Sequence, residues 1–142
     1  MIAPETYVGA ALTANAIWTL LDQRRYDDIL SHLAPDCAWE RTEGWVQGHA
    51  NLRASFLARP ADLLSRHVVS NFTIEQSADG RLTGRCYVTA YFARTEDLAA
   101  TQLMDQPYIV GDVDLEFVRS GPHVLLSRIG VHKAFAIEAL IQ

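Results

Sequence analysis

The spacing of apolar residues changes half-way along the chain, from steps of three and four residues to alternation with polar residues. From Pro4 to Arg24, apolar side chains recur at helical spacing, which predicts an amphipathic helix with a broad apolar face. A short second helix is expected from Asp27 to Leu33, because aspartate suits a helix N-cap. A third is expected from His49 to Leu57, after a short strand from Cys37 to Arg41.

Alternating apolar and polar residues predict four long strands in the second half of the chain. Their expected ranges are 66–76, 81–93, 107–119 and 123–133. Asp79-Gly80 and Ser120-Gly121-Pro122 supply the turns of two hairpins. Strands longer than the usual ~5–6 residues twist and bulge, so the sheet is expected to curl. Within the first strand, the alternation assigns His67 and Asn71 to one face and Val68 to the other.

This order of elements predicts an α+β fold, with helices packed against an antiparallel meander. A chain of 142 residues is expected to form a single domain over residues 1–142. A domain of this size buries enough surface to need no metal or disulfide as a staple. Because Cys37 and Cys86 lie far apart without CxxC spacing, we expect two buried thiols.

Charge and motifs narrow the function classes. The chain has 12 basic and 17 acidic residues and a net charge of −5, which argues against nucleic-acid binding. We find no apolar run of the ~18 residues that a membrane span needs and no signal-peptide pattern, so a cytoplasmic protein is expected. No phosphate-binding or dinucleotide-binding glycine motif and no metal-ligand spacing occurs, so neither a cofactor nor a metal is expected.

Several stretches together resemble the SnoaL-like branch of the NTF2-like (cystatin-like) superfamily. They are the turn and strand from Leu33 to Trp39, Gly48 at the start of a helix, the segment from Arg66 to Asn71, and the closing hairpin that ends at Leu126-Ser127-Arg128. The resemblance implies a cone, in which three N-terminal helices pack on a strongly curved, mostly antiparallel sheet around one apolar pocket, usually in a homodimer. This superfamily includes isomerases, dehydratases, cyclases and the non-catalytic small subunits of ring-hydroxylating dioxygenases.

His67 is the leading candidate for a catalytic residue. An imidazole can act as an acid or a base near neutral pH, and scytalone-dehydratase-like members of the superfamily use pocket histidines in this way. A position at the start of the first long strand would place His67 near the mouth of the cone. The alternative is a histidine at a strand end that only forms a hydrogen bond with a neighbour.

Asp114 is the second candidate, on the ground of the resemblance. Ketosteroid-isomerase-like and SnoaL-like enzymes carry an aspartate on the corresponding strand, pointing into the cavity. The matching position here is Asp114 or, one residue along, Leu115. The alternation favours the opposite orientation, because Asp112 and Asp114 share a face that lies opposite the apolar residues of the strand.

Arg41 occupies the position of the isomerase-like base, and Ile17 that of the isomerase-like tyrosine, so steroid-isomerase chemistry is not expected. Arg41 could instead bind a carboxylate or enolate oxygen, or pair at the surface with Glu40 or Glu43. The remaining candidates for the ligand pocket are Asn71 and aromatic residues that the cone would bring together. The aromatic residues are Trp18, Trp39, Tyr87 and Tyr91, each of which could also serve as core.

Two functions from different classes follow from these residues. The first is a cofactor-independent lyase or isomerase that acts on a small hydrophobic compound, aromatic, polyketide or terpenoid-like, with His67 as the acid or base and Asp114 as its partner. The second is a non-catalytic ligand-binding or accessory domain, like the dioxygenase small subunits. The apolar tail from Ala134 to Gln142 is expected to pack on the domain or on a partner, and a homodimer is the natural hypothesis.

Overall fold

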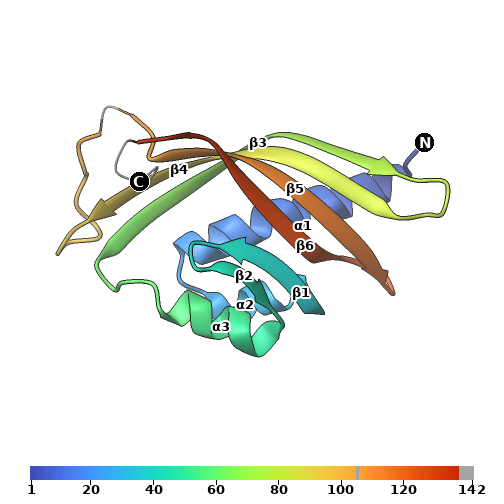
Figure 1. Cartoon of the computed structure of the whole chain (residues 1–142), viewed down its shortest axis with the longest axis horizontal. Coiled ribbons are helices and arrows are strands. Elements are labelled where there is room, and N and C mark those ends of the chain that lie inside the picture. The colour runs from blue at the N-terminus through green and yellow to red at the C-terminus, as the bar shows by residue number, and fades with distance from the viewer. Residues whose placement is uncertain (105, 138–142) are drawn as a thin grey trace.

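Six strands form one curled sheet that three helices cover on its concave side, in a computed structural model that describes residues 1–104 and 106–137 (Figure 1). The helices are α1 (Pro4–Asp22), α2 (Tyr26–Leu30) and α3 (His49–Leu57). The strands are β1 (Leu33–Arg41), β2 (Gly44–Gln47), β3 (Leu63–Gln76), β4 (Leu82–Arg94), β5 (Ile109–Ser120) and β6 (His123–Ala136). The predicted α+β cone is confirmed, and the sheet is curled without closing.

The sheet has the strand order β2-β1-β6-β5-β4-β3, and β1 and β6 are its parallel pair. The other neighbours are antiparallel. Consequently one end of the sheet is formed by the start of β3, the end of β4, the start of β5 and the end of β6. Strand β1 runs toward this end, but its last pairing is that of Trp39 with Ile129, near the middle of β6. We call this end the mouth, and the concave side of the sheet the cup.

Helix α1 fills the cup, and the long strands β3 to β6 arch over it (Figure 1). Its buried face includes Ala10, Ala14, Ile17 and Leu21, which recur at the three- and four-residue spacing seen in the sequence. The Thr13 hydroxyl donates a hydrogen bond of 2.8 Å to the Val124 carbonyl and so ties the helix to β6. The last turn of α1 thereby reaches the mouth.

The first half of the chain differs from the expectation in two places. Helix α2 is shorter than predicted, and β1 begins at Leu33 because residues 33–39 pair in parallel with β6. Strand β2 was not predicted. Gly44, with φ 109°, makes the tight turn that folds β2 back on β1, a backbone conformation that favours glycine.

Strand β3 contains a bulge that reverses the alternation of its side chains. The register with β4 shifts between Ser70 and Thr73, and Asn71 has φ 55°, a left-handed conformation that asparagine tolerates. His67 points into the cup before the bulge, and Phe72 packs against the core after it. Asn71 is exposed. The prediction that Asn71 shares the inner face with His67 is therefore wrong.

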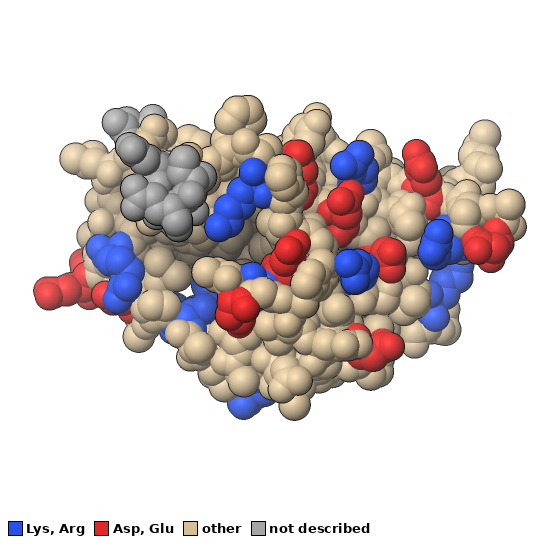
Figure 2. Space-filling model, in the orientation of Figure 1, with Lys and Arg blue, Asp and Glu red and all other residues tan. Residues whose placement is uncertain are grey.

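Acidic and basic side chains are interspersed over the face shown in Figure 2, without a broad patch of one sign. Within residues 1–104 and 106–137, no helix is both long enough and apolar enough to cross a membrane. Strand β6 carries the predicted tail as far as Ala136, where Phe135 is exposed, and residues 138–142 lie outside the described part of the chain.

Candidate active site at the mouth of the cup

A buried aspartate and a buried histidine form a pair at the mouth. Asp22 is the last residue of α1, and its Oδ1 lies 2.6 Å from Nδ1 of His67 on β3. The Asp22 Oδ2 accepts a hydrogen bond of 2.8 Å from the backbone N–H of His67. The two side chains are only 10% and 7% exposed. Because an ionised carboxylate only accepts hydrogen bonds, Nδ1 of His67 donates to Asp22, and in the neutral imidazole Nε2 is then the acceptor.

Two further residues hold the aspartate in place. The Ser65 hydroxyl donates to Asp22 Oδ1 at 2.8 Å, and Arg59 Nη2 donates to Ser65 Oγ at 2.8 Å. Arg59 Nη1 also donates to the Leu21 carbonyl at 2.9 Å, which joins the segment after α3 to the end of α1. Each oxygen of the carboxylate is thus engaged, so the orientation of the His67 ring is fixed from two elements of the fold.

Aromatic rings enclose the imidazole. Trp18, one helical turn before Asp22, stacks on His67 with ring centroids 5.0 Å apart and an angle of 29° between the planes. Phe92 of β4 meets the same imidazole edge-on at 5.6 Å. Trp39 packs edge-on against Trp18 at 5.1 Å and is 1% exposed. Such walls exclude water and strengthen electrostatic interactions inside the site.

The second ring nitrogen of His67 has no partner in the described part of the chain. Its Nε2 makes no hydrogen bond within residues 1–104 and 106–137. In a neutral imidazole, Nε2 is therefore the nitrogen that can accept a hydrogen bond or a proton.

Arg41 is the last residue of β1, and its side chain borders the same aromatic interior. Its guanidinium carbon is 5.2 Å from the centre of the Trp39 ring and 5.1 Å from that of Phe56. Its Nε donates to Ser55 Oγ at 3.2 Å, and that hydroxyl donates in turn to Glu43. Burial, and next the positive charge of Arg59, lower the pKa of Arg41 to about 10. Arg41 therefore remains a cation at neutral pH.

The sequence suggested Glu40 or Glu43 as an ion-pair partner for Arg41. The structure links Glu43 to Arg41 through the Ser55 hydroxyl, a hydrogen bond that lowers the pKa of Glu43. Glu40 instead accepts a hydrogen bond of 2.9 Å from the backbone N–H of Val131. Arg41 thus points into the cup beside Trp39 and is not a surface arginine.

The other predicted site residues lie on the outer face of the sheet. Asp114 forms an exposed ion pair of 2.9 Å with Arg85, and their side chains are 69% and 72% exposed. Tyr87 and Tyr91 point outward because their neighbours on β4 fill the core, and Asn71 is turned out by the bulge. The expected partnership of His67 with Asp114 does not form, and Asp22 takes that place.

Asp22 was missed by the sequence analysis, although a signal for it exists. Residues 14, 18 and 22 follow one another at four-residue steps, so a carboxylate continues the buried stripe of Ala14 and Trp18. A charged residue at such a position is rarely buried without a partner. A basic residue on the first long strand was therefore to be expected opposite it.

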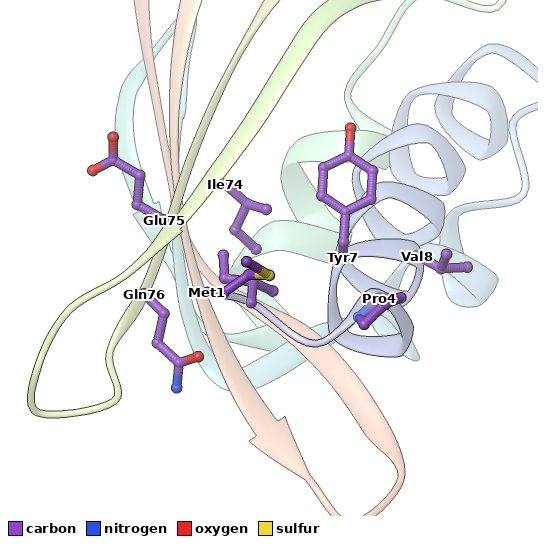
Figure 3. A pocket seen from close by; sticks show the side chains of 8 residues that line it. Met1, Pro4, Tyr7, Val8, Ile74, Glu75 and Gln76 are labelled. Atoms are coloured by element: carbon purple, nitrogen blue, oxygen red, sulfur yellow. The ribbon is translucent and has the colours of Figure 1, made fainter.

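Two hollows on the surface lie away from this pair. A groove of about 700 Å³ separates the start of α1 from the end of β3, and Figure 3 shows Tyr7 of the helix and Ile74 of the strand on its sides. It is at the end of α1 opposite to Asp22. A second hollow of about 430 Å³ lies on the outer face beside Asn71, Tyr87 and other residues of β3 to β5.

Within the described part of the chain, no cluster of three or more histidine, cysteine or acidic residues is placed to hold a metal ion. Cys37 and Cys86 are buried and free, and burial raises the pKa of each thiol to about 12. The polar groups that border the aromatic interior are therefore the Asp22–His67 pair and Arg41.

The sequence profile of the SnoaL-like domain family matches residues 12–121. The chain therefore belongs to the SnoaL-like family, and the resemblance noted from the sequence is confirmed. The matched segment contains Trp18, Asp22, Arg41 and His67, that is, the whole candidate site. No curated protein sequence matches the chain.

Solved structures share the fold at low sequence identity. A cystatin-like protein of unknown function from Nostoc punctiforme is 19% identical, with a TM-score of 0.78 and coverage of 97% of this chain and 98% of that one. ActVI-ORFA from Streptomyces coelicolor is 17% identical, with a TM-score of 0.74 and coverage of 91% and 97%. A proposed scytalone dehydratase from Novosphingobium aromaticivorans is 12% identical, with a TM-score of 0.75 and coverage of 92% and 85%. At these identities the likeness shows the cystatin-like cone alone.

Proposed function

We propose that this protein is a cofactor-independent lyase that eliminates water from a small hydrophobic β-hydroxy carbonyl compound. His67 is the general base and acid, and Asp22 orients it. The observation that carries the proposal is the buried hydrogen bond of 2.6 Å between Asp22 Oδ1 and His67 Nδ1, which leaves Nε2 as the acceptor at the mouth. A base placed in this way contributes about 10²–10⁴-fold to the rate of a proton transfer.

In the proposed reaction, Nε2 of His67 removes the proton from the carbon next to the carbonyl group. The electron pair of the C–H bond forms the enolate, which then expels the hydroxyl group from the β-carbon. The proton on Nε2 passes to that leaving oxygen, so water departs and the imidazole is neutral again. During the reaction the Asp22 carboxylate accepts the hydrogen bond from Nδ1 of His67, so the proton on Nδ1 stays on the imidazole. An isomerase would share the first step and return the proton to a different carbon.

The walls of the mouth support an apolar substrate with a flat ring. Trp18, Trp39 and Phe92 surround the imidazole with aromatic surface. One solved structure of the same fold is described as a proposed scytalone dehydratase. A dehydratase removes water from its substrate, which is the kind of reaction proposed here. No step of the proposed reaction needs a metal or an organic cofactor, because the imidazole both takes and returns the proton.

The proposal is tested with a panel of small aromatic β-hydroxy ketones, whose dehydration produces a conjugated enone that absorbs in the near ultraviolet. We expect turnover by the wild type, and a loss of about 10²–10⁴-fold in kcat/KM for His67→Gln and Asp22→Asn. Asp114→Asn is the matched control, because this carboxylate lies on the outer face, and it should keep the wild-type rate. A His67→Gln variant that retains the wild-type rate would refute the assignment.

One observation favours the second candidate function, a non-catalytic ligand-binding or accessory domain. Trp18 stacks directly on His67, so one face of the imidazole is covered. A domain that only binds a ligand does not need both faces of the His67 imidazole to be accessible. Such a domain would bind an aromatic ligand at the mouth without chemical change. His67→Gln would then alter the affinity for that ligand, and neither the variant nor the wild type would catalyse a reaction.

A homodimer through the outer face of the sheet is also part of the proposal. The family resemblance implies it, and exposed apolar residues on that face support it, among them Val68 and Tyr87, which are 51% and 48% exposed. Light scattering at micromolar concentration should give twice the mass of the chain. A monomer under those conditions would refute it.

A further inference from the structure

His67 and Arg41 border the same aromatic interior of the cup. His67 lies near the start of β3, at one edge of the sheet, and Arg41 ends β1, next to the other edge. The two residues come from strands far apart in the sheet, and the rings of Trp18 and Trp39 lie between them. A ligand that packs on these rings can therefore be recognised by both the imidazole and the guanidinium.

A continuous set of ring contacts connects the two groups. Trp18 stacks on His67, Trp39 packs on Trp18, and the Arg41 guanidinium lies over Trp39. The charges are connected as well, because Arg59 supports the Asp22–His67 pair through Ser65 and its positive charge acts on Arg41. Arg41 thus belongs to the same interior surface as the proposed base.

The Arg41 side chain presents unused hydrogen-bond donors. Its Nε is bonded to Ser55, whereas its two terminal nitrogens make no hydrogen bond or ion pair within residues 1–104 and 106–137. The side chain is half-buried between the rings of Trp39 and Phe56. Two parallel N–H groups at the edge of a planar cation match the two oxygens of a carboxylate.

The local charge balance points to an anion. Arg41 and Arg59 are close enough for the charge of one to act on the other, and the Asp22 carboxylate is already engaged by His67 and Ser65. The nearest acid to Arg41, Glu43, is exposed and reaches it only through the Ser55 hydroxyl. A ligand that brings one negative charge would neutralise a cation that the fold keeps away from water.

We propose that Arg41 binds a carboxylate of the substrate, so that the protein acts on small aromatic acids in preference to neutral compounds. The Trp39 and Phe56 rings hold the guanidinium, and the apolar body of the ligand lies toward Trp18 and His67. This inference rests on the proposed function in placing the reacting carbon at His67, but the binding of the carboxylate is tested without any reaction.

The experiment compares naphthoate with naphthamide by isothermal titration calorimetry at neutral pH. The two probes share the same ring and differ in the charge of one small group. We expect wild-type protein to bind naphthoate about 10- to 100-fold more tightly than naphthamide, as for charge-assisted hydrogen bonds in a partly buried site. Arg41→Gln should bind both probes with the affinity of wild type for naphthamide. Arg41→Lys, which keeps the charge without the planar pair of donors, should retain a part of the preference.

Two controls separate this inference from the proposed reaction. Arg85→Gln removes an exposed arginine of the outer face and should keep the full preference for naphthoate. The dehydration assay on the wild type is run in parallel, and the preference for naphthoate should be found whether or not that assay gives turnover. Circular dichroism establishes that each variant is folded. If Arg41→Gln does not fold, Arg41→Lys takes its place in the comparison of the two probes. Equal affinities of wild type for both probes, no binding of naphthoate at millimolar concentration, or a preference that survives in Arg41→Gln would overturn the inference.

Discussion

Asp22 and Asp114 have very different surroundings in the structure. Asp22 is buried and accepts hydrogen bonds from the His67 ring, the His67 backbone N–H and the Ser65 hydroxyl. Asp114 is exposed and pairs with Arg85 alone. Replacing each by alanine therefore removes a carboxylate of the same kind from two very different surroundings.

The expected magnitudes follow from these contacts. Asp22→Ala leaves three buried donors without an acceptor, namely the His67 ring N–H, the His67 backbone N–H and the Ser65 hydroxyl, which in total costs about 3–5 kcal/mol of the free energy of unfolding. Asp114→Ala breaks an exposed ion pair, which contributes about 0–1 kcal/mol. With an m-value of about 2 kcal/mol per molar urea, the unfolding midpoint of Asp22→Ala should fall by about 1.5–2.5 M, and that of Asp114→Ala by less than about 0.5 M.

Urea unfolding followed by far-ultraviolet circular dichroism measures both variants beside the wild type. The m-values should stay unchanged, because both variants keep the fold. The reasoning is refuted if Asp22→Ala unfolds within about 0.5 M urea of the wild type, or if Asp114→Ala is destabilised as much as Asp22→Ala. The first result would mean that the pair at the mouth contributes nothing to the folded state.

Three further predictions follow from other parts of the fold. Arg41→Met should raise the free energy of unfolding by about 1–2 kcal/mol. The burial that lowers the pKa of Arg41 to about 10 costs about 3 kcal/mol, and two cation–π contacts return about 1–2 kcal/mol. The folded protein releases the Arg41 proton at a lower pH than the unfolded chain does, so the advantage of the variant should shrink above pH 10, and a less stable variant in thermal unfolding would contradict the prediction. Gly84→Ala should lower the free energy of unfolding by about 1–3 kcal/mol, because the added Cβ would lie 3.0 Å from the Thr73 carbonyl oxygen; a neutral result in urea unfolding would contradict it. Cys37 and Cys86, whose pKa values are raised to about 12 by burial, should react with a thiol reagent at pH 8 only after denaturant is added, and prompt labelling of the folded protein would show that one of them is accessible.

Much of the fold could be predicted because its main elements follow simple periods. The four-residue steps of α1 and the alternation of β4 and β5 depend on one buried face each, and the structure buries that face. Alternation even assigned Asp114 to the solvent, against the family precedent. The spacing of apolar residues is sufficient to predict the buried face of an element that stays regular over its whole length.

The site could be predicted only in part, because it depends on contacts between distant segments. The bulge at Asn71 is one residue long, yet it exchanges the faces of everything after it, and nothing in the alternation reveals it. Asp22 becomes a partner of His67 only through the docking of α1 against β3, across 45 residues of sequence. Arg41 could be named from its position, but its aromatic surroundings required the parallel pairing of β1 with β6.

That parallel pairing has a consequence for how the protein is made. Strand β6 is the last of the six described strands and lies in the middle of the sheet, between β1 and β5. On the ribosome, β1 and β2 emerge early but have no neighbour to complete their pairing until β6 leaves the exit tunnel. Contacts between residues so far apart in sequence slow folding and leave strand edges exposed meanwhile. The nascent chain therefore cannot assemble the mouth stepwise, and its native sheet forms only after β6 has left the exit tunnel.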